Sequence, residues 1–221
     1  MFRGPGGGAR ERDVSREALR VAEVVPLAPT GRDAATIVAG LRRGAPEAAA
    51  ALYDRVAGRV NRLVARMLGS DPEHDDVVHQ VFLNVFSSVG SLRDAAALDG
   101  WVVGLTVNTV RRELRRRKYR RLLRLDVAAA AATGEPLAPG LDPERQMVAH
   151  RFYAALERMG VNDRIAFTLR TIEGCALAEV AVACGCSVAT AKRRVARAFE
   201  SLTQAAERDP VLAAWTRSEQ R

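Results

Sequence analysis

LAEVAVACGCSVATAKRRVARAFESL, residues 177–202, is the stretch of this chain with the most regular pattern. Apolar residues recur at helical spacing in its first part. They give a short helix an apolar face made of Leu177, Val180, Ala181 and Cys184. Gly185 can supply a turn after this helix, and Ser187 is a typical N-cap for a following one. Two helices joined by such a short turn predict a helix-turn-helix.

The second helix of this stretch has two chemically different faces. We expect its buried stripe to consist of Val188, Ala191, Val195, Ala198, Phe199 and Leu202. Early residues of such a helix approach base edges in a major groove, while arginine bonds guanine or neutralises phosphate. A solvated basic face on an ordinary helix is the alternative, but the capped turn favours DNA binding. The predicted DNA-binding residues are Ser187, Ala189, Thr190, Lys192, Arg193, Arg194 and Arg197.

The composition and charge of the chain also indicate a nucleic-acid partner. The chain has 221 residues, of which 48% are hydrophobic and 5% aromatic, a mixture that favours helices packed by small aliphatic side chains. We therefore expect an all-α fold with two small helical domains. The net charge of +8 is most concentrated between Arg111 and Arg124. A basic run of this density indicates a polyanion site more often than a solvated helix end.

Several other classes of function find no support in the residues. The cysteines Cys175, Cys184 and Cys186 have the spacing of neither a zinc site nor a disulfide framework, so we predict no metal, no cofactor and a reducing compartment. There is no HExxH motif, phosphate loop or nucleophile elbow, which argues against an enzyme. The N-terminus has no signal-peptide core, and no apolar run approaches a membrane span. We expect a cytoplasmic protein without a membrane partner.

Helix caps and breakers divide the rest of the chain. Asp33 caps a short helix that Gly44 ends, and Pro46 begins a longer one that ends at Gly69. Ser70 or Asp71 is expected to cap a third helix, with Pro72 at its first position and the acidic residues after it serving the helix N-terminus. We expect a loop over residues 91–100, a fourth helix from Trp101 towards Arg117, and a further helix capped by Asp142. The expected organisation is an extension over 1–32, a helical domain over 33–122, a flexible linker over 123–141, a second domain over 142–208 and a tail over 209–221.

The fourth helix is amphipathic in an unusual way. At 100° per residue, Val103, Val107, Val110 and Leu114 fall on one side. The other side carries Trp101, Leu105, Asn108, Arg112 and Arg115. We expect the aliphatic side to meet the core, which leaves the side with tryptophan, asparagine and arginine for a partner.

Three segments together resemble a known family. They are DDVVHQVFLNVF at 75–86, WVVGLTVNTVRRELRRRK at 101–118 and EGCALAEVAVACGCSVATAKRRVARAFESL at 173–202. Their order and content resemble sigma factors of bacterial RNA polymerase, in the extracytoplasmic-function (ECF) class of the sigma-70 family. The resemblance implies that the first domain binds core RNA polymerase and the −10 promoter element, and that the helix-turn-helix domain reads the −35 element.

The resemblance also assigns roles to single residues. Carried over position by position, it implies that core polymerase is bound by Asp75, Asp76, Val78, His79 and Phe82. It implies that the −10 side of promoter DNA is bound by Trp101, Asn108, Arg111, Arg112 and Arg115. An anti-sigma factor is a further partner that the family implies.

Two other interpretations of the sequence remain. In a conventional helix-turn-helix activator or repressor, only the C-terminal domain would bind DNA, and the chain would bind a tight operator alone. A sigma factor needs polymerase for firm promoter binding. A recombinase with a helix-turn-helix tail would need a nucleophilic serine or tyrosine, but Tyr53, Tyr119 and Tyr153 have no catalytic setting.

Overall fold

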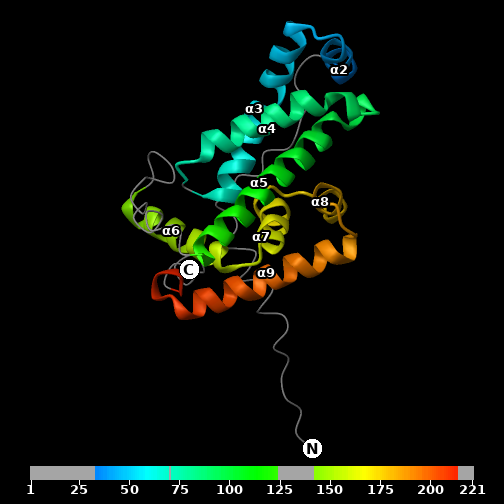
Figure 1. The fold of residues 1–221 in the computed structure, drawn as a ribbon. Coiled ribbons are helices and arrows are strands. Elements are labelled where there is room, and N and C mark those ends of the chain that lie inside the picture. Colours follow the sequence, from blue (N-terminus) through cyan, green and yellow to red (C-terminus); the bar gives the residue numbers. More distant parts are fainter. Residues whose placement is uncertain (1–32, 70, 124–141, 214–221) are drawn as a thin grey trace, which may run out of the picture.

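The computed structural model describes residues 33–69, 71–123 and 142–213, and within these ranges it contains helices and turns but no strand (Figure 1). The expected all-α class is therefore confirmed. The expected extension over 1–32 lies outside the described residues, as do residues 124–141 of the expected linker and residues 214–221 of the tail.

The first helical unit contains four helices, and local signals explain most of their ends. They are α2 (Ala34–Arg42), α3 (Pro46–Leu68), α4 (His74–Ser88) and α5 (Leu98–Leu122). Asp33 caps α2, since its carboxylate accepts a hydrogen bond from the Ala35 amide at 3.3 Å. α3 ends at Gly69, whose φ of 77° lies in the left-handed region that favours glycine.

Two predicted boundaries in this unit are wrong. The third helix was expected to begin at Pro72, but α4 begins at His74, because the Asp71 carboxylate accepts from the Glu73 amide at 2.8 Å and closes a turn first. The loop over 91–100 was expected to run to Gly100, but α5 begins at Leu98. Asp94 caps a 3-10 turn, Ala95–Ala97, that leads directly into this helix.

The second helical unit follows its sequence signals closely. It contains α6 (Pro143–Arg158), α7 (Val161–Phe167) with one wider π-helical turn (Thr168–Ile172), α8 (Leu177–Cys184) and α9 (Val188–Arg208). Asp142 caps α6 by accepting from the Arg145 amide at 2.8 Å, as predicted. Beyond α9 the Asp209 carboxylate accepts from the Val211 amide at 3.0 Å, and Leu212 is buried. The start of the expected tail therefore packs on this unit.

The two units share one hydrophobic core. α5 packs against α3 and α4 on one side and against α7 and α8 on the other (Figure 1). The largest buried cluster accordingly joins Val103, Val107 and Val110 of α5 to Ile165 of α7 and Val180 of α8. A helix covered on both sides buries polar side chains as well as apolar ones. Two threonines on α5, Thr106 and Thr109, satisfy their hydroxyls by donating to backbone carbonyls one turn earlier, each at 2.9 Å.

Candidate functional site

The helix-turn-helix has the geometry that the sequence predicts. Gly185 ends α8 in the left-handed region, with φ of 61°. The Cys186 amide then donates to the Ala181 carbonyl at 2.9 Å, which closes the helix end. The Ser187 hydroxyl accepts from the Thr190 amide at 3.2 Å and caps α9. The orientation of α9 relative to α8 is therefore fixed by backbone contacts and one cap.

The early part of α9 presents a chain of polar side chains to solvent. Ser187, Ala189, Lys192 and Arg193 are exposed, and Thr190 is half-buried. The hydroxyls of Ser187 and Thr190 lie 3.0 Å apart, and Arg193 donates to the Thr190 hydroxyl at 3.3 Å. These bonds orient the Arg193 guanidinium before any ligand arrives, which lowers the entropy lost when it binds.

Two basic residues of α9 have protein partners or partial burial that the helical pattern did not show. Arg197 makes two hydrogen bonds to the Asp163 carboxylate of α7, at 3.1 and 2.8 Å. The hydrogen bond that Arg197 donates to Asp163 is the main reason that the pKa of Arg197 is raised. Arg194 is half-buried, with one terminal nitrogen inside the protein.

The predicted buried stripe of α9 is wrong at its first residue. Val188 is 50% exposed, because it stands at the first position of the helix, ahead of the turn that packs on the core. Burial begins with Ala191 and continues through Val195 and Ala198.

The sequence predicts the buried aliphatic face of α5 correctly, but its predicted partner face only in part. Val103, Val107, Val110 and Leu114 are buried. The other face leaves Asn108, Arg112 and Arg115 exposed, whereas Trp101 and Leu105, also expected to face a partner, are half-buried against the core. Arg111 lies between the faces: it donates to the Asn108 side chain at 2.7 Å and to the Cys184 carbonyl of α8 at 3.1 Å. Of the five residues expected on the −10 side, Arg111 is thus already engaged by the second unit.

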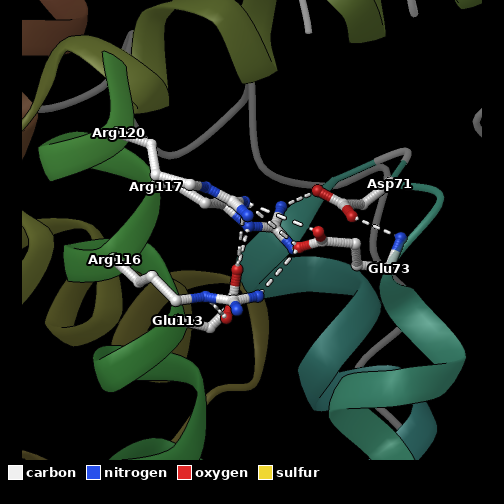
Figure 2. Close-up of polar contacts among 6 residues, drawn as sticks. All are labelled: Asp71, Glu73, Glu113, Arg116, Arg117 and Arg120. Atoms are coloured by element: carbon white, nitrogen blue, oxygen red, sulfur yellow. Dashed lines mark hydrogen bonds and ion pairs between the residues drawn. The ribbon is translucent and has the colours of Figure 1, made fainter. Parts of the chain in front are cut away.

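Three arginines near the end of α5 pair with carboxylates of the protein itself (Figure 2). Arg117 pairs with Asp71, with Glu73 at 3.2 Å and with Glu113 at 2.7 Å. Its neighbours Arg116 and Arg120 also pair with Glu73 and Glu113, at distances from 2.9 to 3.8 Å. We call these six residues the α5 ion-pair cluster. The expectation that the run between Arg111 and Arg124 serves a polyanion did not include these carboxylate partners of Arg116, Arg117 and Arg120.

The cluster also corrects the expected role of Glu73. Its carboxylate pairs with arginines of α5 instead of serving the α4 N-terminus alone. Burial is the largest influence on both glutamates of the cluster. Burial raises the pKa of Glu113. At Glu73, hydrogen bonds with the Glu113 and Arg120 side chains outweigh burial, so the pKa of Glu73 is lowered. The cluster thus fixes the α3–α4 connection to the far end of α5.

A groove of about 430 Å³ opens between α3 and α4. It is lined by Tyr53, Asn61, Asp75, Val78, His79, Phe82, Leu83 and Phe86, which we call the aromatic groove. The Tyr53 and Phe82 rings lie 4.8 Å apart across it. Tyr53, Leu83 and Phe86 are 49%, 48% and 38% exposed, which is unusual for large apolar side chains on neighbouring turns.

The groove gathers most of the residues expected to bind polymerase. Asp75, Val78, His79 and Phe82 line it, whereas Asp76 is exposed outside the lining. Four further lining residues were not predicted from the sequence: Tyr53, Asn61, Leu83 and Phe86. Two of them could have been predicted from helical spacing. Leu83 and Phe86 follow His79 by four and seven residues, so they lie on the same face of α4. Tyr53 and Asn61 of α3 could not be predicted in this way, because the groove residues that they contact lie on α4, a different helix.

Fold and site together define a helical protein with a helix-turn-helix formed by α8 and α9 and an apolar groove between α3 and α4. Comparison with known proteins is more specific. Residues 52–120 match the family model for sigma-70 region 2, and residues 149–202 match that for sigma-70 region 4, so the two matches cover more than half of the chain. The chain belongs to the sigma-70 family and is a sigma factor of its ECF class.

The curated relatives match over most of their length. The RNA polymerase sigma-H factor of Pseudomonas aeruginosa is 27% identical over 177 residues, which cover 76% of this chain and 91% of that protein. The ECF RNA polymerase sigma-E factor of Escherichia coli K12 is 28% identical over 174 residues, covering 75% and 90%. The RNA polymerase sigma factor CarQ of Myxococcus xanthus is 26% identical over 164 residues, covering 74% and 91%.

Solved structures support the fold. CnrH in complex with the cytosolic domain of CnrY aligns with a TM-score of 0.56 at 20% identity, covering 80% of this chain and 98% of that one. The sigma factor RpoE from Bartonella quintana, in complex with the anti-sigma factor NepR, aligns with a TM-score of 0.53 at 20% identity, covering 71% and 95%.

Within the described part of the chain, none of the helices has the length and apolar character needed to cross a membrane.

Proposed function

We propose that the aromatic groove is the surface by which this sigma factor docks on core RNA polymerase. Exposed Tyr53, Leu83 and Phe86 offer apolar anchor points around a concave floor. Asp75 lies in the lining and Asp76 beside it, so the rim is acidic. A partner surface with apolar side chains and a basic rim complements this arrangement. The concentration of large exposed apolar side chains in one groove is the single observation that carries the proposal.

We further propose that the two helical units read the two promoter elements. The first unit, 33–122, would act as a region-2-like domain whose α5 face of Trp101, Asn108, Arg112 and Arg115 meets the −10 side. The second unit, 142–208, would act as a region-4-like domain that places the start of α9 in the major groove at −35. The exposed Ser187, Ala189, Lys192 and Arg193 support this role, because they occupy the first turns of the recognition helix.

The protein then works by binding and not by catalysis, in the cytoplasm where polymerase transcribes. A conventional activator or repressor is less well supported, because the family matches span both helical units and not the helix-turn-helix alone. An anti-sigma factor is a proposed further partner. Two structural neighbours support it, since they were solved with CnrY and with the anti-sigma factor NepR.

The groove is tested by truncating Phe86 and measuring binding of the purified chain to core polymerase. Loss of a central apolar anchor should weaken binding about tenfold in Phe86→Ala. Met147→Ala is the matched control, because Met147 is also a large exposed apolar residue, at 44%, but lies on α6. The control should bind like the wild type, and both variants should unfold at nearly the wild-type temperature. Wild-type affinity in Phe86→Ala would rule out the groove as the docking surface.

A further inference from the structure

The start of α9 exposes apolar side chains directly beside cationic ones. Val188 is 50% exposed, and Ala189 after it is exposed as well. Lys192 and Arg193 follow these two residues by four positions each, so each cation lies on the same side of the helix as one of them. Both cations are exposed. The positive charge suits a polyanion, so the partner that covers Val188 is expected to be DNA.

The polar side chains of this first turn are engaged with one another. The Ser187 hydroxyl accepts from the Thr190 amide at 3.2 Å and lies 3.0 Å from the Thr190 hydroxyl. The Thr190 hydroxyl also accepts from Arg193 at 3.3 Å. The side chains of Val188 and Ala189, by contrast, end in methyl groups. The first turn of α9 therefore offers a base edge mainly apolar contact.

The major groove of DNA contains a matching apolar group. Thymine presents its C5-methyl there, whereas guanine and adenine present only hydrogen-bond donors and acceptors, and cytosine presents an amino donor. Residues at the N-terminal end of a recognition helix are the ones that reach base edges. Val188 is the first residue of α9, so its methyl groups lie where such a contact forms.

The shape and the position of Val188 both suit this contact. The branched Cβ atom of valine leaves one strongly preferred χ1 rotamer in a helix, so little side-chain entropy is lost on binding. Exposure alone is not sufficient, as Val182 illustrates. This valine is 78% exposed but belongs to α8, and the first helix of a helix-turn-helix crosses the DNA backbone instead of entering the groove.

We propose that Val188 is a specificity-determining residue that reads the C5-methyl of a thymine in the −35 element. The inference rests on the proposed placement of α9 in the major groove at −35. Arg193 and Lys192 supply contacts to phosphate or guanine, and Val188 adds a preference for thymine at one position. Uracil differs from thymine only by the missing methyl group, so the holoenzyme should bind it more weakly at that position.

Uracil substitution tests the contact from the DNA side. The probe is a promoter fragment that the wild-type holoenzyme transcribes, with each thymine of the −35 element replaced singly by uracil, in either strand. Binding of the holoenzyme is measured by fluorescence anisotropy at one fixed salt concentration. At one position the affinity should fall about fourfold, which is the value of one methyl group lost from an apolar contact.

Val188→Ala tests the same contact from the protein side. It should bind the unmodified fragment about fourfold more weakly than the wild type does. On the fragment with uracil at the sensitive position, both proteins should bind equally, because the two changes remove one and the same contact. Val182→Ala is the matched control, since it truncates an exposed valine of α8, and it should behave like the wild type on both fragments. All three proteins should unfold at nearly the same temperature, because both valines are exposed.

Three results would overturn the proposal. Wild-type affinity for every uracil fragment would show that no thymine methyl is read, and this result needs no variant. A uracil effect that persists in Val188→Ala would assign the thymine to another residue. An equal loss of affinity by Val188→Ala on both fragments would show that Val188 contacts something other than the methyl group. Failure of the wild-type holoenzyme to transcribe any promoter would instead contradict the proposed function, so the two failures are distinguishable.

Discussion

Neighbouring arginines of α5 that look equivalent in the sequence differ in exposure and in their ion-pair partners. Arg115 is exposed, whereas Arg117 is 12% exposed and touches three carboxylates. Its partner Glu113 lies one turn away, but Asp71 and Glu73 lie more than forty residues earlier in the chain. The charge run was therefore visible in the sequence, and its internal neutralisation was not.

This difference predicts that substitution of Arg117 affects stability, whereas substitution of the nearby Arg115 affects promoter binding. Arg117→Met leaves three crowded carboxylates without their main cation and should lower the free energy of unfolding by about 3 kcal/mol. Arg115→Met should change it by less than about 0.5 kcal/mol but weaken promoter binding several-fold. Chemical denaturation and holoenzyme binding to a promoter measure the two effects. Equal stability losses in both variants would contradict the structural role assigned to Arg117.

At the scale of helices, boundaries set by a local cap were predictable. Asp33, Asp142 and Ser187 cap the helices that their side chains suggest. The start of α5 was not predictable from such signals, because it depends on tertiary contacts. Leu98 is fully buried, and Asp99 pairs with Arg55 of α3 at 2.7 Å. These contacts stabilise an additional helical turn in a segment whose alanines, glycine and aspartates suggested a loop.

The turn of the helix-turn-helix gives a prediction at this scale. Gly185 has φ of 61°, and a Cβ atom built on it would meet nothing within 4 Å. Gly185→Ala should therefore lower the free energy of unfolding through backbone strain alone, by about 1 to 2 kcal/mol. Gly185→Asn should lose less, because asparagine tolerates the left-handed region better. Thermal unfolding would contradict this explanation if alanine proved no worse than asparagine.

At the scale of the whole molecule, the sequence predicted the two units but not their contact. The helical pattern showed which face of α5 is apolar, but a pattern cannot say how many neighbours share that face. Val103, Val107 and Val110 belong to a cluster that extends into α7 and α8. The aromatic groove likewise depends on a contact between separate helices: its α4 residues share a helix face, while Tyr53 lies on α3. Pairings between distant segments are what the sequence left open.

The central claim is that this chain directs core RNA polymerase to promoters by binding. Run-off transcription with purified core polymerase on a pool of promoter fragments, with and without the chain, tests it most directly. We predict defined transcripts that depend on the chain, from fragments that share two sequence elements upstream of the start. The claim would be contradicted if no transcript depended on the chain and if the chain neither bound core polymerase nor altered its output.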